Sequence, residues 1–551
     1  MMRKKSRSIS GSIAGVMAVV ALVTACSSGG SGADDESATP VSGGTLTYAS
    51  YRDATCMDPH VSPGDIVGEL QRNVFDSLVA QKSDGTFAPW LASAWKISAD
   101  GKEYVFTLRP DVKFFDGTPF DAAAVKANFE HILAPATKSQ YAASLLGPYA
   151  GTDIIDDHTV RVRFTQPYSP FLQAASTAYL GFYSPKVLAE HPDELCGGGR
   201  YAVGSGPFRE LSVTHGQGIE FERNPDYAWP PATARHTGPA YLDKLSVRYL
   251  TEDAVRTGAL RGGQVDVIAG TPPADYQALQ QDPAYRIVRG DAPGAPYTFF
   301  FNQSKEPFSD IRARQAVSAA IDIDGIVDSI YLGVYPRAYG PLSASTPGYD
   351  ASVEKRPGYD VAKANRLLDE LGYTGRDAQG YRIKDGHRFG LVLPYASNLV
   401  RESRDLVTQA VQQDLKKVGI ELRLTPVDYG TYTTIIAANG YDLVGASWGR
   451  SDADVLATLY QSDRSVAKGG ANNGKVADPQ LDALLQQGRA TADPAQRAAA
   501  YKQAQQLILD KAYALPIYVF TGVYTAAARV HGFGLDANGW SNFYDTWVEH
   551  S

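Results

Sequence analysis

The chain has 551 residues, of which 44% are hydrophobic, so it is long enough for a large core and for roughly two to four domains. Its formal net charge at pH 7 is −8. This acidic balance makes polyanions poor partners, and we expect no nucleic-acid binding.

The first 25 residues have the pattern of a secretory signal peptide. Four basic residues lie within the first seven positions, and an uncharged, largely apolar stretch follows from Gly11 to Ala25. That stretch is shorter than the roughly 20 apolar residues that a membrane span needs. Without residues 1–25 the chain has 48 Lys and Arg against 60 Asp and Glu, a net charge of −12.

The end of this signal matches the lipobox of bacterial lipoproteins. Residues 23–26 read Val-Thr-Ala-Cys, and the polar, Gly- and Ser-rich stretch 26–44 suits a flexible tether. An ordinary cleavage site beside a chance cysteine is the alternative. We predict a lipid on Cys26 that anchors the protein to the outer face of the bacterial cytoplasmic membrane.

Two cysteines remain once Cys26 is assigned to lipid. Cys56 and Cys196 form an even pair in an exported protein, which predicts a disulfide. Two separate buried thiols are the alternative, because spacing along the chain does not fix the distance between them.

Strands are predicted first. Residues 45–50 alternate apolar and polar side chains, and residues 103–110 place three large apolar side chains on one face. The same alternation of apolar and polar side chains occurs at 159–165, 218–224 and 244–250.

Helices are predicted between and after these strands. The first covers 121–133, with Asp121 as its N-cap. A second begins behind Asp360 and stops at Gly372, and a third runs from 403 to Gly419, directly before a strand that bears Ile420. This alternation predicts a mixed α/β architecture with several sheets.

Catalytic motifs have little support in the sequence. Residues 469–476 have the spacing of a phosphate-binding loop but end in Val476, where a hydroxyl is needed for magnesium. The segment around Ser205 and Gly206 lacks the outer-glycine spacing of a nucleophile elbow. The nine histidines show no metal-binding spacing. We therefore expect no enzyme, no bound metal and no cofactor.

Aromatic side chains are abundant, with 32 Tyr, 20 Phe and 6 Trp. Most belong to the core, and we expect the rest to line a ligand cleft, above all in 296–303 and around Trp448. Residues 448–460 read WGRSDADVLATLY, where two aspartates follow a Trp and an Arg. Such a pair suits a catalytic acid and base, a metal clamp, a receptor for a cationic group or a solvated loop.

Longer strings carry a resemblance to a known family. Residues 88–133, from APWLASAW to NFEHIL, resemble the signature region of the family 5 solute-binding proteins of ABC importers. This family includes the receptors for oligopeptides, dipeptides, nickel and related solutes. CMDPH at 56–60, GSGPF, FERNPDYAW, GGQVDV and FNQSKEPFSDIRARQAVSAAID are similar to family segments and follow in the same order. The resemblance covers essentially all of the chain after the tether.

The resemblance implies a two-lobed periplasmic-binding-protein fold of class II, cluster C type, with an additional domain in the first lobe. By this likeness, domain I covers 45–80, 201–295 and 516–551, domain II covers 81–200, and domain III covers 296–515. The crossings near 295 and 515 would form a hinge that closes around the ligand. The disulfide would then pin the base of domain II.

The resemblance also implies the ligand site. In the family's peptide receptors, an Asp three residues after the Trp pairs with the peptide's α-amino group, and Ser451 holds that place here. Asp452, one residue later, is then either the ammonium receptor or, with Asp454, a cap of the helix that begins at Val455. We assign these residues to the cleft: Tyr51, Arg52, Ser205, Gly206, Tyr297, Phe299, Asn302, Trp448, Arg450, Ser451, Asp452 and Asp454.

Three functions follow as hypotheses. The first is a lipid-anchored, monomeric receptor that captures peptides or similar small solutes and delivers them to ABC permease subunits in the membrane. The second is the same fold with a non-peptide ligand, such as an oligosaccharide, an opine-like compound or a metal chelate. The third is a secreted hydrolase, for which no nucleophile with its base is visible.

Overall fold

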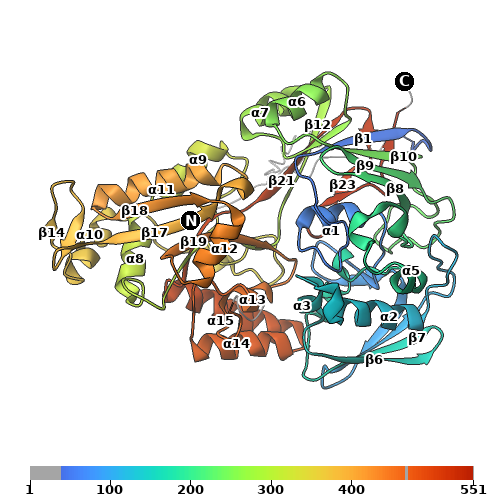
Figure 1. Cartoon of the computed structure of the whole chain (residues 1–551), viewed down its shortest axis with the longest axis horizontal. Coiled ribbons are helices and arrows are strands. Elements are labelled where there is room, and N and C mark those ends of the chain that lie inside the picture. The colour runs from blue at the N-terminus through green and yellow to red at the C-terminus, as the bar shows by residue number, and fades with distance from the viewer. Residues whose placement is uncertain (1–38, 466–469, 550–551) are drawn as a thin grey trace, which may run out of the picture. The chain divides into compact units, whose positions relative to one another are not determined.

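The structure is a computed structural model that describes residues 39–465 and 470–549. The predicted signal peptide and Cys26 lie outside the described residues. Helices and strands alternate along the chain (Figure 1), which confirms the predicted α/β class. Among the described residues, no helix is both long and apolar enough to cross a membrane.

A seven-stranded sheet collects segments from both ends of the chain. β1 pairs in parallel with β10 and β11, and the other pairs are antiparallel. The red strand β21, near the C-terminus, lies between β11 and the green strand β12 (Figure 1). In sheet order the strands are β12 (Tyr285–Asp291), β21 (Thr521–Ala527), β11 (Val267–Ala269), β1 (Thr45–Ser50), β10 (Lys244–Tyr249), β9 (Gly218–Arg223) and β8 (Phe208–Thr214).

A four-stranded antiparallel sheet shares a hydrophobic core with it. Its order is β4 (Ala92–Ile97), β5 (Glu103–Leu108), β7 (Thr159–Phe164) and β6 (Tyr149–Asp156). Leu46 of the large sheet and Phe106 of the small one belong to the same core cluster, and both are fully buried. The other elements of this region are α1 (Asp65–Gln71), β2 (Val79–Gln81), β3 (Phe87–Pro89), α2 (Ala122–Leu133), α3 (Ala142–Leu146), α4 (Phe171–Ala174), α5 (Pro185–Glu190), α6 (Asp253–Arg261) and α7 (Pro273–Gln281).

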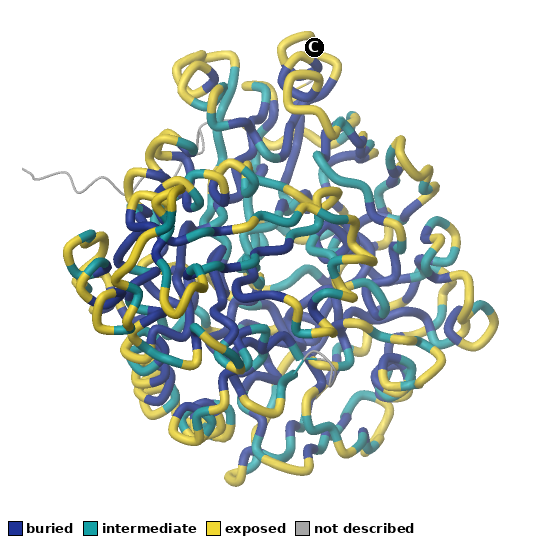
Figure 2. The backbone as a smooth tube through the Cα atoms, turned by 60° about the vertical axis from the view of Figure 1, so that its left-hand side comes forward, coloured by how far each residue is buried: buried dark blue, intermediate teal, exposed yellow. Residues whose placement is uncertain are grey.

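A second region is built on strand β13 (Gly294–Phe301), which is buried along its whole length. β13 lies between β19 (Leu443–Gly449) and β20 (Ala514–Tyr518), and β17 (Gly390–Ala396) pairs in parallel with β18 (Glu421–Val427). In Figure 2 the buried stretches run through the interior and exposed loops surround them. The helices here are α8 (Ile311–Ala320), α9 (Ile323–Tyr331), α10 (Val361–Glu370), α11 (Arg404–Val418), α12 (Tyr429–Ala437), α13 (Val455–Tyr460), α14 (Pro479–Ala490) and α15 (Pro494–Asp510).

Short elements complete the fold. They are the strands β14 (Gly375–Arg376), β15 (Arg382–Lys384), β16 (His387–Arg388), β22 (Val530–His531), β23 (Gly534–Leu535), β24 (Ser541–Asn542) and β25 (Trp547–Val548). The 3₁₀ turns are η1 (Pro135–Thr137), η2 (Ala178–Leu180), η3 (Leu195–Gly197), η4 (Gly199–Tyr201), η5 (Ala351–Lys355) and η6 (Ser397–Leu399).

The predicted helix ends are confirmed. The side chains of Asp121 and Asp360 accept hydrogen bonds of 2.8 Å from Ala124 N and Lys363 N. Helix α11 stops at Gly419, whose φ of +88° suits a residue without a Cβ, and β18 begins two residues later.

The chain passes between the two regions twice, at adjacent points. β12 ends at Asp291 and β13 begins at Gly294, while β20 ends at Tyr518 and β21 begins at Thr521. The crossings are joined by a hydrogen bond of 2.8 Å from Ala292 N to Phe520 O. We call residues 39–291 and 521–549 the first lobe, and residues 294–518 the second lobe.

The predicted disulfide between Cys56 and Cys196 is present, with 4.3 Å between the Cα atoms. Met57 N donates a 2.9 Å hydrogen bond to Cys196 O beside it. The bridge therefore fastens the segment after β1 to the segment that precedes β8, within the first lobe.

Candidate functional site

A narrow cleft lies beside the two crossings and is lined by both lobes. The first lobe contributes Tyr51, Arg52 and Asp65, and the second contributes Arg401 and Arg450. Its free volume is about 50 Å³, room for only a few waters at roughly 10 to 15 Å³ each. The lobes are therefore closed, and they must part to admit a solute of dipeptide size.

Two arginines carry unused donors at this cleft. Nη2 of Arg52 donates to the hydroxyl of Tyr51 at 3.0 Å, but its Nε is buried without a hydrogen-bond partner. Arg450 is 6% exposed, and its Nη2 likewise has no partner. A buried donor without a partner costs free energy, so both groups favour an acceptor in the cleft.

Arg401 is held by a neighbouring carboxylate. Its Nε lies 3.1 Å from Glu402 Oε1, and its Nη2 donates to Ser447 Oγ at 3.3 Å. Burial acts to raise the pKa of Glu402, but Arg404 and Arg401 outweigh it and lower that pKa to about 2. Glu402 therefore stays ionised and orients Arg401 at the edge of the cleft.

Asp65 is the open carboxylate of the cleft. It stands in the first turn of α1 and lines the cleft, where its charge attracts the Arg52 guanidinium and helps to raise the pKa of that group. Glu69, one turn later, accepts from Tyr48 Oη at 2.8 Å and from Ser541 Oγ, and burial raises its pKa. Of these two carboxylates, Asp65 is therefore the one available to a cationic group.

The residues assigned from sequence fall into separate places. Tyr51, Arg52 and Arg450 line the cleft. Trp448 lies between two cleft-lining residues of β19 and packs against core clusters of both lobes, with its ring centroid 6.2 Å from that of Tyr141. Tyr297 lines a different, small cavity of the second lobe, under the guanidinium of Arg404.

Two others lie in the core of the second lobe and do not line the cleft. Phe299 is fully buried in a core cluster. Asn302 is also fully buried, and its Nδ2 donates to Asn439 Oδ1 at 2.8 Å and to Tyr441 O at 2.9 Å. The side chains of β13 alternate between the two faces of the sheet, but both faces are buried. The alternation therefore does not place one set of side chains in the cleft and the other in the core.

The GSGPF turn is likewise internal. Ser205 Oγ donates to Asp76 Oδ2 at 2.9 Å, and Gly206 approaches the backbone of Asn73 and Val74 so closely that a Cβ would lie 2.5 Å from Asn73 O. Gly206 N donates to Val74 O and Phe208 N to Asn73 O, so the turn packs against the segment after α1 and does not line the cleft.

The two aspartates after Trp448 are paired inside the protein. Asp452 is 5% exposed and Asp454 is 1% exposed, and Arg497 and Arg489 lie 2.6 Å and 3.1 Å from their respective carboxylates. Asp454 occupies the N-cap position of α13 without a side-chain cap. Ser451 is buried beside them. The structure thus differs from the expectation of an open ammonium receptor, while Asp452 Oδ1 accepts a 2.7 Å hydrogen bond from Asp454 N directly before α13.

Asp65 and Arg401 were missed from the sequence. Asp65 has no distinctive neighbours, and Arg401 directly precedes a turn with a φ of +53° at both Glu402 and Ser403, which no sequence pattern predicts. Both reach the cleft only because the lobes fold together.

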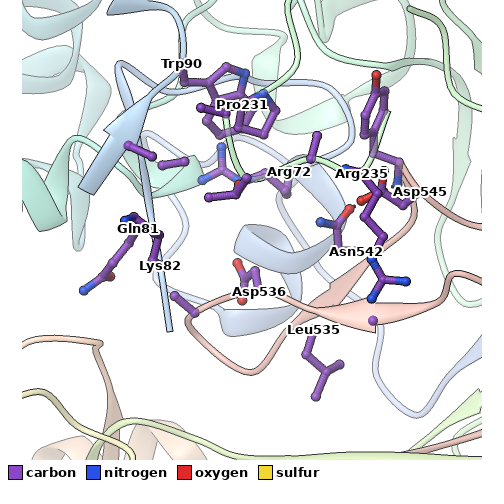
Figure 3. A pocket seen from close by; sticks show the side chains of 18 of the residues that line it. Arg72, Gln81, Lys82, Trp90, Pro231, Arg235, Leu535, Asp536, Asn542 and Asp545 are labelled. Atoms are coloured by element: carbon purple, nitrogen blue, oxygen red, sulfur yellow. Dashed lines mark hydrogen bonds between the residues drawn. The ribbon is translucent and has the colours of Figure 1, made fainter. Parts of the chain in front are cut away.

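A larger cavity lies wholly within the first lobe. Its volume is about 760 Å³, and Figure 3 shows Arg72, Trp90 and Asp536 among the residues around it. The Arg72 guanidinium lies over the Trp90 ring and donates to Ser176 O at 2.7 Å. Asp536 accepts from two backbone amides of its own loop. These charges are already bound, so we favour the cleft as the functional site despite its smaller volume.

Metal binding has no candidate in the described part of the chain. There, no three His, Cys, Asp or Glu side chains come together in a way that could hold an ion.

Comparison with known proteins gives a consistent result. Residues 86–470 match the model of the bacterial extracellular solute-binding proteins, family 5. A probable D,D-dipeptide-binding periplasmic protein of Escherichia coli is 28% identical over 501 residues, 89% of this chain and 91% of that protein. A di/tripeptide-binding protein of Pseudomonas aeruginosa is 27% identical, over 91% and 94% of the two chains.

Solved structures share the fold. NikA from Brucella suis, solved in complex with Fe(III)-EDTA, superposes with a TM-score of 0.79 at 25% identity and covers 92% of this chain and 100% of its own. The two-lobed periplasmic-binding-protein fold expected from the sequence is thereby confirmed.

Proposed function

The chain belongs to the bacterial extracellular solute-binding proteins, family 5, and from this premise we propose how it serves as the substrate-binding protein of an ABC importer for peptides or related solutes. The solute binds between the lobes, in the cleft beside the crossings. The loaded receptor then delivers it to the permease. The observation that carries the proposal is the set of open charges that both lobes turn toward this cleft.

The charges define the chemistry of the solute. Arg52 and Arg450 offer unpaired donors to a carboxylate, and Asp65 offers a carboxylate to an ammonium group. A zwitterion such as a short peptide satisfies both. In this proposal Asp65, on the first lobe, takes the part that the family's peptide receptors give to an aspartate of the second lobe.

A second candidate is an anionic solute that is not a peptide. It is favoured by the excess of arginines over carboxylates in the cleft lining, where Arg52, Arg401 and Arg450 stand against Asp65 and Glu69. The related NikA was solved with a carboxylate-rich chelate. Such a solute would use the arginines and leave Asp65 without a role.

The domain layout expected from the family stays part of the proposal. Domain I (45–80, 201–295 and 516–551) is supported by the seven-stranded sheet, whose strands come from all three stretches. Domain II (81–200) is supported by the separate four-stranded sheet, and domain III (296–515) by the strands and helices around β13. The crossings between domains I and III act as the hinge.

Calorimetry with alanyl-alanine tests the peptide proposal. Asp65→Asn and amino-terminal acetylation should each weaken binding by roughly 2 to 5 kcal/mol, because each leaves a partner charge buried alone. The two losses should not add, since both delete one pair. Arg52→Gln and the carboxy-terminal amide should behave in the same way.

The control is Asp156→Asn, which removes an exposed carboxylate of β6, a strand that does not line the cleft, and should leave the affinity unchanged. Equal affinities for free and blocked dipeptides would contradict the ion pairs. No binding of any dipeptide, with an anionic solute found by native mass spectrometry in protein from its own host, would favour the second candidate.

The lipid anchor is tested separately. Cys26 is the acyl acceptor that the lipobox provides, so Cys26→Ser should move the protein from the membrane fraction to the soluble fraction of its host. Unchanged membrane fractionation of the variant would contradict the anchor without affecting the cleft.

A further inference from the structure

We infer that the buried ion pairs around Asp452 and Asp454 form an interlobe anchor, which holds the lobes closed and positions Arg450 at the cleft. The anchor consists of five second-lobe residues: Arg450, Asp452, Asp454, Arg489 and Arg497. The inference concerns the closing of the lobes and holds for any solute.

Within the second lobe the anchor is a network. Arg497 Nη2 lies 2.6 Å from Asp452 Oδ1, and Arg489 Nε lies 3.1 Å from Asp454 Oδ1. Arg450 Nη1 lies 3.4 Å from Asp454 Oδ2, and Tyr501 Oη donates to Asp454 Oδ1 at 3.1 Å. The aspartates therefore fix the directions in which the three arginines point.

The same arginines bind the first lobe. Arg450 Nε donates to Gln173 Oε1 at 3.2 Å, and Arg497 Nε donates to Ser169 Oγ at 2.9 Å. Ser169 N in turn donates to Arg489 O at 2.9 Å. Each arginine of the anchor thus joins an aspartate of its own lobe to a residue of the other.

A further bond crosses at the same place. Gln81 Nε2 donates to Ser451 O at 2.9 Å, so the residue that stands between Arg450 and Asp452 is also held by the first lobe. These four interlobe hydrogen bonds therefore meet on the SDAD segment and on the helices that carry Arg489 and Arg497.

The free energies of these contacts are consistent with lobes that open and close reversibly. The ion pairs lie wholly within the second lobe and persist when the lobes part, while Ser169 and Gln173 exchange their bonds to the arginines for water. Desolvation of buried ion pairs largely offsets their attraction, so these hydrogen bonds add to the preference for the closed state that the contact between Trp448 and Tyr141 also supports. Loss of one of them should shift the population visibly.

Arg450 connects this anchor to the cleft. Its Nη1 and Nε are held by Asp454 and Gln173, which leaves the buried Nη2 without a partner in a residue that lines the cleft. Three arginines against two aspartates also leave one positive charge of the anchor without a counter-charge inside it. An anionic group in the cleft would supply that charge only when the lobes are closed.

Hydrogen exchange of the full chain without added solute tests the anchor. The amide of Ser169 is bonded to Arg489 O across the lobes, so it exchanges when they part. Arg497→Gln should accelerate its exchange about tenfold or more, the effect of one lost hydrogen bond to a charged group. Ser169→Ala removes the same bond from the other lobe, together with the 3.2 Å hydrogen bond from Ser169 Oγ to Gly488 O, and should accelerate exchange at residue 169 at least as much.

Arg382→Gln is the matched control. Arg382 is also buried and paired with Asp369 in the second lobe, but its contacts lie within that lobe, so the variant should leave residue 169 unchanged. Unchanged exchange at residue 169 in Ser169→Ala and Arg497→Gln would overturn the anchor. Equal acceleration by Arg382→Gln would overturn it too, because the amide would then report the general stability of the second lobe.

Discussion

The hydroxyl of Thr521 donates a 2.6 Å hydrogen bond to Asp291 Oδ1, which joins the last residue of β12 to the first residue of β21. Thr521 is fully buried. Because the two residues stand where the chain enters and leaves the second lobe, this bond ties the two crossings together at the pivot between the lobes.

Thr521→Val should loosen that pivot. The substitution keeps the shape and removes the donor, so we expect the free energy of unfolding to fall by about 1 kcal/mol. We also expect a broader distribution of lobe separations, measured by small-angle X-ray scattering. Thr257→Val is the control, since buried Thr257 donates to Asp275 Oδ2 at 3.0 Å away from the crossings. Identical scattering from the two variants and the wild type would contradict a pivotal role.

The disulfide should contribute strongly to stability. Cys56 and Cys196 are 140 residues apart, and the chain-entropy model gives about 4 to 5 kcal/mol for a loop of that length. Urea unfolding of a variant with both cysteines changed to serine should show this loss. Wild type in reducing buffer should match the variant, and equal midpoints without reductant would disprove the contribution.

Acid should destabilise the protein through a pair of histidines, of which His60 is fully buried. His60 Nε2 lies 2.9 Å from Gly181 O and therefore donates, and His60 Nδ1 lies 3.1 Å from His131 Nδ1. Burial lowers the pKa of both rings to about 4, against roughly 6.5 in an unfolded chain. Between these values the folded state binds fewer protons, so stability is present above pH 6.5 and is lost as pH falls toward 4. For His60 alone the loss is about 1.4 kcal/mol per pH unit.

Buried carboxyl groups have the opposite effect on the pH dependence of stability. The contribution of the histidines must therefore be measured as the difference between wild type and a variant without them. Burial raises the pKa of Asp58, beside His60, and raises the pKa of Asp76 and of Glu210 to about 7. These groups stabilise the fold as pH falls. Urea unfolding at pH 7 and pH 5 should therefore compare wild type with a His60→Asn, His131→Asn variant. If the two proteins lose stability equally between those pH values, the histidines are not responsible.

Gly206→Ala should destabilise the first lobe by about 1 to 3 kcal/mol, the range for overpacking. A Cβ there would lie 2.5 Å from Asn73 O and 2.7 Å from Val74 C, so backbone must move. Gly258→Ala, in the exposed face of α6 with open space around the new Cβ, should stabilise by about 0.5 to 1 kcal/mol. Thermal unfolding of both variants checks the opposite signs, and equal shifts would refute the close approach at Gly206.

Local features of the fold followed from the sequence because they depend on neighbours in the chain. An aspartate such as Asp360 caps the helix that follows it, and Gly419 ends α11 by its own backbone freedom. The disulfide followed from counting cysteines in an exported chain. None of these inferences needs a contact between distant segments to be known in advance.

The cleft was only partly predictable for the opposite reason. Asp452 has the residue type of an ammonium receptor, but its partner Arg497 stands 45 positions later on α15, where no motif marks it. Asp65 became a cleft residue through the closing of the lobes, which brings it to within 3.7 Å of where a Cβ on Gly449 would stand. The sequence pattern shows which side chains can bind a charged ligand. The tertiary contacts determine which of these side chains are already paired with another residue of the protein.

The two adjacent crossings have a topological consequence. β12 and β21 are antiparallel neighbours, and Asp291 and Thr521 face each other in register at their ends. In any ordinary hairpin, two residues would suffice to join strands so placed. The whole second lobe therefore occupies the position of a hairpin loop, and replacing residues 292–520 with an Asn-Gly turn would restore a continuous β-hairpin at the edge of the seven-stranded sheet.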